Sequence, residues 1–152
     1  MKLNKIIECL EKWAPPSLQE EYDNSGLIIG NNENEIKGIL VTLDCTEEII
    51  NEAIKKKCNL IISHHPLIFR PIKKITGSNH VERSIIKAIQ NSISIYSIHT
   101  NLDNILSGVN YKIADKIGLK QIKILDKKIN ILSKIEFYIP KDYKENVLKN
   151  LF

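Results

Sequence analysis

The sequence predicts an α/β fold in which a mostly parallel sheet is flanked by helices. Apolar, strand-like runs at 38–44, 59–63 and 92–98 alternate with segments whose apolar residues recur at helical spacing. Strands separated by single helices are normally parallel, with right-handed crossovers. The runs are almost continuously apolar, which is typical of a sheet covered on both faces. We therefore expect repeated β-α-β units over residues 38–118.

A helix and a strand precede these units. Four apolar residues share one helical face of residues 3–13, and two prolines follow shortly afterwards. The stretch "GLIIG" at 26–30 predicts a strand.

The helices between the strands carry recognisable start signals. Thr46 is a suitable N-cap, with acidic residues in the following turn and lysines in the last one. Asn79 is expected to cap the next helix, and Glu82 three residues later completes a capping box. Ser107 is expected to cap a helix that continues through Ile117, before a glycine suited to left-handed backbone.

Composition limits the class of protein. The 152 residues are 43% hydrophobic and 26% charged, as in a soluble globular domain, and no apolar run approaches the roughly 20 residues of a membrane span. Acidic residues within the N-terminal apolar segment argue against a signal peptide. Three scattered cysteines without a CxxC pair favour reduced thiols and a cytoplasmic location. The net charge of +4 comes with no nucleic-acid recognition motif, so no nucleic-acid partner is predicted.

Polar side chains follow three of the predicted strands. Asp44 ends the first, His64 and His65 follow the second in "SHHP", and His99 and Asp103 follow the third in "HTNLD". Ligands of parallel α/β sheets bind beyond the carboxyl ends of the strands, so we expect these groups to meet. Imidazole and carboxylate together suit Zn, Fe, Mn, Co or Ni ions. The sequence therefore predicts a metal site at this edge.

Each of these residues has an expected role. His64 and His65 are interpreted as metal ligands or catalytic groups, and Asp103 as a bridging or terminal ligand or an Asx-type turn. His99 is a ligand, a proton shuttle or a group that orients a ligand. Asp44 is interpreted as a strand-end cap for the following helix rather than a ligand. Two metals about 3.5–4 Å apart would activate a water and hold a substrate oxygen.

Other polar features receive structural interpretations. His80 lies at the start of a predicted helix, and "DNSG" at 23–26 is favoured as a turn that enters a strand, over a substrate contact. Ser63 lacks the G-x-S-x-G pattern of a nucleophile elbow. No glycine-rich phosphate-binding motif occurs.

Four segments, in order, resemble the signature blocks of a known family: "EYDNSGLIIG", "ILVTLDCTEEIINEAI", "LIISHHPLIFRPIKKI" and "IYSIHTNLDNILSGVN". The family is that of the dinuclear-metal-centre proteins known as type 2 GTP cyclohydrolase I homologues, and the match covers about residues 1–120. The resemblance implies an α/β fold, a toroidal homohexamer and two divalent cations in an internal cavity. It further implies that His64, His65 and Asp103 are metal ligands, and that some members open the purine ring of GTP.

The sequence departs from this family near its end. The family's remaining ligands, a His and a Glu, lie close to its C-terminus, whereas no histidine follows His99 here. Residues 129–152 resemble the opening strand, expected at 131–139, and helix of an inserted α+β domain, which follows a metal-binding domain at 1–128. We therefore expect the chain to be the N-terminal portion of a longer protein that holds one metal or none by itself.

Two classes of function remain open. The first is a metal-dependent hydrolase acting on a purine nucleotide such as GTP or a related C–N bond, with His99 as a catalytic residue and lysines holding phosphate. The second is a non-enzymatic metal-binding or protein-interaction scaffold that forms a toroidal oligomer. Both classes use the same ligands, so the sequence does not separate them.

Overall fold

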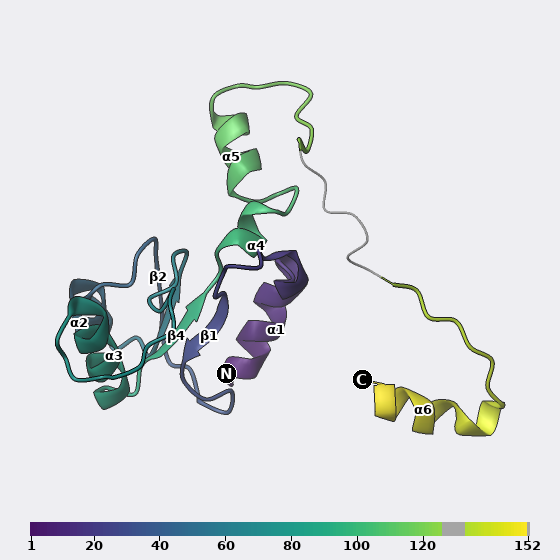
Figure 1. Cartoon of the computed structure of the whole chain (residues 1–152), viewed down its shortest axis with the longest axis horizontal. Helices are drawn as coiled ribbons and strands as arrows, with labels where there is room; N and C mark the ends of the chain where they lie inside the picture. Colours follow the sequence, from purple (N-terminus) through teal and green to yellow (C-terminus); the bar gives the residue numbers. More distant parts are fainter. Residues whose placement is uncertain (126–132, 152) are drawn as a thin grey trace.

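The computed structural model describes residues 1–125 and 133–151 and confirms the α/β fold (Figure 1). Its sheet has four strands in the order β1-β4-β3-β2. Strands β2, β3 and β4 run parallel, and β1 pairs antiparallel with β4. The strands are β1 (Gly26–Ile29), β2 (Ile39–Thr42), β3 (Leu60–Ser63) and β4 (Ser94–Ser97).

Helices lie on both faces of the sheet (Figure 1). Two of them, α2 and α3, cover one face, and α1 covers the other. The helices are α1 (Leu3–Trp13), α2 (Glu47–Lys55), α3 (His80–Gln90), α4 (Thr100–Asp103), α5 (Val109–Lys116) and α6 (Lys144–Leu151), with short 3₁₀ turns η1 (Pro16–Leu18) and η2 (Lys141–Tyr143). None of the helices in the described ranges is long and apolar enough to cross a membrane.

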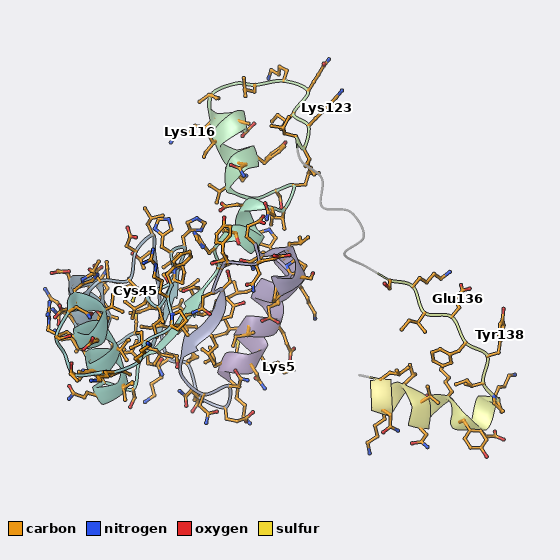
Figure 2. All side chains as sticks on the ribbon, viewed as in Figure 1. Lys5, Cys45, Lys116, Lys123, Glu136 and Tyr138 are labelled. Carbon is orange, nitrogen blue, oxygen red and sulfur yellow. The ribbon has the colours of Figure 1, made fainter. Side chains whose placement is uncertain are left out.

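Alternating residues of β3 divide the core into two clusters. Ile61 packs with Ile50 of α2 and Ile85 of α3, in the cluster that also contains Cys45 (Figure 2). Its neighbours in β3 point to the opposite face and pack with α1. This period of two is what a strand buried on both faces requires.

The sequence predicts a sheet whose two faces are both covered, and this prediction is wrong for the edge strand β2. Ile39 and Val41 pair in register with Leu60 and Ile62, so their side chains share the α1 face of the sheet. Both are exposed, Val41 by 74%. The reason is the strand order, because α1 packs over β3 and β4 while β2 lies at the edge of the sheet.

The predicted caps of α2 and α3 are confirmed. The Thr46 side chain accepts a hydrogen bond from the Ile49 amide, and the Asn79 side chain accepts one from the Glu82 amide. The Glu82 carboxylate does not bind the backbone amide of the N-cap residue, as a capping box would, but those of Thr76 and Ser78. The loop before α3 therefore folds back over the start of the helix.

The predicted cap of α5 is wrong. Gly108 occupies the N-cap position, and the Ser107 hydroxyl accepts a hydrogen bond from Trp13 Nε1 at 3.3 Å. A Cβ on Gly108 would lie 1.8 Å from the Leu102 carbonyl oxygen, so the close approach of the backbone requires glycine there. Gly118 adopts φ +80° after α5, as predicted.

The strand predicted at 131–139 is not formed in the part that the structure describes. Residues 131–132 lie outside the described residues, and 133–139 are irregular. A strand needs neighbours to satisfy its backbone groups; Figure 1 shows this segment apart from the sheet, and Figure 2 shows Glu136 and Tyr138 extending from it. The proposed boundary between residues 128 and 129 stays a prediction.

Candidate metal centre

The carboxyl ends of β3 and β4 bring three histidines together. Ser63 and Ser97 are paired in the last register position of these strands, and their hydroxyl oxygens lie 3.1 Å apart. His64 and His65 follow the first strand directly, and His99 lies two residues beyond the second. Neighbouring parallel strands that end level with each other therefore place the side chains at one edge, as the sequence predicts.

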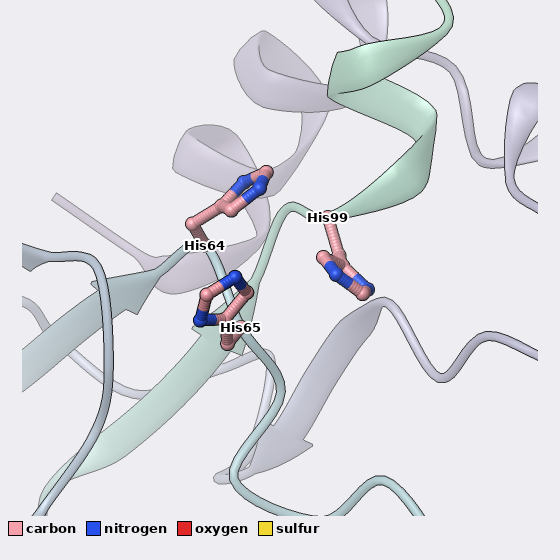
Figure 3. Close-up of side chains that lie close together, drawn as sticks. All are labelled: His64, His65 and His99. Carbon is pink, nitrogen blue, oxygen red and sulfur yellow. The ribbon is translucent and has the colours of Figure 1, made fainter. Parts of the chain in front are cut away.

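The three rings form a compact histidine cluster, defined here as His64, His65 and His99 (Figure 3). Their ring centroids are separated by 5.0, 5.1 and 5.4 Å. One ring nitrogen from each residue lies within 4.8 Å of the others. Adjacent residues of a regular strand point to opposite faces, so the bend after Ser63 is what turns both neighbouring rings into one cluster.

Each ring of the cluster uses its Nδ1 to bind an acceptor outside the cluster. The three pairs are His64 with the Ile98 carbonyl at 2.9 Å, His65 with Asp44 Oδ1 at 2.7 Å, and His99 with Asp23 Oδ1 at 2.8 Å. A carbonyl or an ionised carboxylate can only accept, so each Nδ1 carries the hydrogen. Since no hydrogen bond to Nε2 of these rings occurs among the described residues, we infer that the Nε2 lone pair of each neutral ring is open to a common ligand.

Asp44 does not have the capping role that the sequence predicts. Thr46 caps α2, and the Asp44 carboxylate binds His65 instead. Backbone hydrogen bonds from His64 and His65 to Thr42 and Leu43 continue the β2–β3 pairing beyond the strands. This pairing places Asp44 next to the turn that carries His65, which the local sequence pattern did not indicate.

Asp103 lies at the rim of the cluster. Its Oδ1 is 3.8 Å from His64 Nε2, which is too long for a hydrogen bond but within reach of a shared cation. Asp103 ends α4, a short helix that the sequence analysis did not anticipate. The buried Asn101 side chain stabilises this helix, since it donates to the Ala14 carbonyl and accepts from the His99 amide.

Asp23 is a site residue that the sequence analysis missed. Its side chain is 0% exposed and accepts hydrogen bonds from His99 and Thr100, which lie 76 and 77 residues away. Burial by itself raises the pKa of Asp23, but hydrogen bonds from Thr100, His99 and Ser25 outweigh burial and hold the pKa below its usual range. The "DNSG" segment leads into β1, but residues 23–25 are irregular, the turn lies at residues 21–22, and Gly26 at φ +105° is the first residue of the strand. Nothing in that segment indicated a partner so distant.

A cavity of about 700 Å³ lies beside the cluster. The loop after His65 and the start of α3 line this cavity. Phe69 of that loop connects the cavity to the histidines, because its ring centroid lies 6.3 Å from that of His99. Its basic lining residues are Arg70, Lys73, Lys74 and His80. His80 is thus separate from the histidine cluster, in agreement with its predicted structural placement at a helix start.

Comparison with known proteins identifies the family. The family model described as Duf34/NIF3 (NGG1p interacting factor 3) matches residues 1–149. The chain belongs to the Duf34/NIF3 family. Within this family, a Staphylococcus epidermidis protein named GTP cyclohydrolase 1 type 2 homolog is 43% identical over 152 residues, which cover 99% of this chain and 41% of that protein. A Clostridium acetobutylicum protein of the same name is 42% identical over 127 residues, which cover 84% of this chain and 47% of that protein.

A solved structure supports the same assignment. The Bacillus cereus protein related to NIF3 matches with a TM-score of 0.80 and 39% identity, over 84% of this chain and 35% of that one. The Duf34/NIF3 chain described here thus spans less than half the length of the curated relatives that it matches. The resemblance inferred from the sequence blocks is confirmed.

The donor set of this Duf34/NIF3 chain suits one divalent metal ion. Two nitrogens bound to the same ion lie at most about 4.2 Å apart, given metal–nitrogen distances of about 2.1 Å. The ring nitrogens of the histidine cluster lie within 4.8 Å of one another, which is slightly wider than this maximum. Small side-chain rotations would bring them to one ion. Three imidazoles with a nearby carboxylate favour Zn, Fe, Mn, Co or Ni over Ca or Mg, which prefer oxygen ligands. A second ion would need further donors.

Proposed function

We propose that this chain carries the metal-binding part of a divalent-metal-dependent hydrolase, acting on a purine nucleotide such as GTP or on a related C–N bond. One observation carries the proposal: the carboxyl ends of β3 and β4 bring three imidazoles together, each with its Nδ1 bound elsewhere. Convergent, pre-oriented donors of this kind are typical of metal sites.

The proposal assigns a role to each residue. His64, His65 and Asp103 hold the metal, and His99 is the catalytic residue, with a lone pair that can accept a proton from a water or substrate. A divalent ion held there supplies Lewis-acid activation of water and of a substrate oxygen. The complete site takes two cations, and this chain alone takes one or none. We also propose a cytoplasmic location and a toroidal homohexamer for the whole protein.

The cavity beside the cluster supports an anionic, ring-containing substrate. Arg70, Lys73 and Lys74 line the cavity and have no ion-pair partner among the residues that the structure describes. The acidic lining residue Glu82 is occupied by hydrogen bonds from the preceding loop. A phosphate group near these cations would leave a base free to stack on Phe69, whose exposed ring contacts both Tyr22 and His99.

Metal analysis of the purified chain tests the site. We expect the wild-type chain to retain a transition metal after dialysis, and the double variant His64→Ala/His65→Ala to lose it. His80→Ala is the matched control, because it removes the one histidine outside the cluster and leaves all three imidazoles in place. Equal metal content in the wild-type chain and the double variant would remove the assignment.

Turnover distinguishes the enzyme from the scaffold. Formate release from GTP with Mn, Fe or Zn present, lost in His64→Ala, would support the hydrolase. The assay should include the full-length Staphylococcus epidermidis relative, of which this chain matches 41%. Turnover by the relative alone would indicate donors outside residues 1–152. Metal uptake by both proteins without turnover would favour the non-enzymatic scaffold.

A further inference from the structure

We propose that Asp23 is a positioning residue that determines which nitrogen of His99 faces the histidine cluster. The inference rests on the proposed function, since it specifies how one residue of that site is prepared for its role. Asp23 lies in the irregular segment before β1, and His99 follows β4, so the two segments meet only in the folded sheet, where β1 and β4 are neighbours.

The Asp23 carboxylate is held in one orientation by donors on both oxygens. Oδ1 accepts from His99 Nδ1 at 2.8 Å and from the Asn24 amide at 2.7 Å. Oδ2 accepts from the Ser25 hydroxyl at 2.8 Å, the Thr100 amide at 3.0 Å and the Thr100 hydroxyl. A fully buried charge is tolerated only with such partners, and five donors leave the side chain no alternative orientation.

This arrangement fixes the tautomer of His99. With Asp23 ionised, Nδ1 must carry the hydrogen, and Nε2 of the neutral ring presents a lone pair. The ring cannot turn over freely, because its side chain is only 18% exposed and lies among the rings of His64, His65 and Phe69. His99 therefore enters the site as an acceptor of a proton or a donor to a metal, and not as an N–H group.

The same carboxylate also fixes the helix that carries Asp103. Oδ2 binds the backbone amide and the hydroxyl of Thr100, the first residue of α4, and Asp103 is the last residue of that four-residue helix. Asp23 thus couples the orientation of His99 to the start of the element that bears the carboxylate of the site. The pair formed by His65 and Asp44 has no such second attachment among the hydrogen bonds of the described residues.

The test is the tautomer of His99, measured by ¹⁵N NMR of the imidazole nitrogens in the metal-free chain at about pH 8, above the ordinary imidazole pKa. In the wild-type chain we expect a protonated Nδ1 and a bare Nε2. In Asp23→Asn, we expect the amide oxygen at the Oδ2 position, which faces the Thr100 amide and two hydroxyls, and not at the Oδ1 position, which faces the Asn24 amide and His99. The NH₂ group then faces His99 Nδ1. We expect the hydrogen of His99 to move to Nε2.

Ser25→Ala is the matched control, because it removes one donor to Asp23 without altering Oδ1, and should leave the tautomer unchanged. A protonated Nε2 in the wild-type chain would overturn the proposal even if Asp23→Asn failed to fold. An unchanged tautomer in folded Asp23→Asn would overturn it as well. These readouts need no metal, so they are independent of whether the proposed function is correct.

A second measurement links the tautomer to the site. If His99 binds the metal in addition to accepting protons, Asp23→Asn should bind Zn about 10- to 100-fold more weakly than Ser25→Ala in competition with a chelator. Equal Zn affinity together with a switched tautomer would mean that Asp23 positions His99 and that His99 is not a metal ligand. His99 would then keep only its proposed catalytic role.

Discussion

The three histidines of the cluster are held with unequal strength. His64 and His99 are largely buried. The partner of His64 is a backbone carbonyl, which can only accept, and the partner of His99 is the buried carboxylate of Asp23. His65 is 47% exposed, and its partner Asp44 is more exposed still. An exposed pair is screened by solvent, so the orientation of His65 depends least on its hydrogen bond.

This difference predicts the effect of Asp44→Ala. Loss of the carboxylate leaves His65 free to take either tautomer but does not leave a buried group without a partner. We expect Zn affinity to fall by about tenfold, at the lower end of what partners of metal-bound histidines contribute, with folding stability nearly unchanged. Chelator competition and thermal unfolding measure the two quantities. An effect larger than that of Asp23→Asn would contradict the ranking.

At the scale of the elements, a single carboxylate holds the loop that precedes α3. Glu82 accepts five hydrogen bonds from three residues of the preceding loop: Thr76, Ser78 and Asn79. The backbone amides of Thr76 and Ser78 contribute most and lower the pKa of Glu82 to about 2. The ionised form is therefore the one that fixes this loop, which also lines the cavity.

The lowered pKa predicts a pH-dependent effect of Glu82→Gln. The folded chain holds this carboxylate ionised down to about pH 2, whereas the unfolded chain protonates it near its ordinary pKa of 4.5. The stabilisation is fully present above pH 4.5 and is lost as the pH falls towards 2. We expect a lower melting temperature than wild type at neutral pH, and a difference that shrinks on acidification.

Thermal unfolding across this pH range measures the difference. Glu8→Gln provides the control, since it alters an exposed carboxylate of α1 that pairs only with Lys5 among the described contacts. A difference between Glu82→Gln and wild type that stays constant with pH would show that the pKa of Glu82 does not differ between the folded and unfolded chains, and would contradict the prediction.

Local sequence signals predicted the elements well where one residue decides the outcome. Thr46 and Asn79 cap their helices because a side-chain oxygen needs only the next turn as partner. The prediction at Ser107 is wrong because the backbone of Gly108 closely approaches the carbonyl of Leu102, six residues earlier, and a capping pattern does not reveal such an approach. The helix α4 was missed for a different reason, since Asn101 stabilises it through the carbonyl of Ala14, which is distant in the sequence.

At the scale of the whole molecule, the sequence predicted the groups that share an edge of the sheet. His64, His65 and His99 follow from parallel strands that end together. Asp23 does not follow, because β1 joins the sheet antiparallel to β4, and its start lies at the edge where the parallel strands end. No periodicity in the chain reveals that the segment before β1 will meet the end of β4.

The sequence likewise could not show which apolar surface remains uncovered. Ile39, Val41 and Leu43 alternate along β2 and its extension, and all three are exposed. The strand is at the edge of the sheet, and within residues 1–125 and 133–151 no further strand pairs with its outer backbone groups. A flat, apolar edge of this kind favours association with a second chain. We expect the homo-oligomer proposed above to use this surface.

The substitution Val41→Lys tests that expectation. Val41 is 74% exposed, so Val41→Lys should leave the fold intact while it places a charge in the centre of the apolar edge and opposes strand pairing. We expect light scattering after size exclusion to show a species larger than a monomer for the wild-type chain and a shift towards monomer for Val41→Lys.

Ile89→Lys is the matched control, since it introduces the same charge at an exposed apolar position of α3. Identical mass distributions for all three chains would mean that the β2 edge does not mediate association, and a monomeric wild-type chain would mean that this chain does not form the oligomer alone.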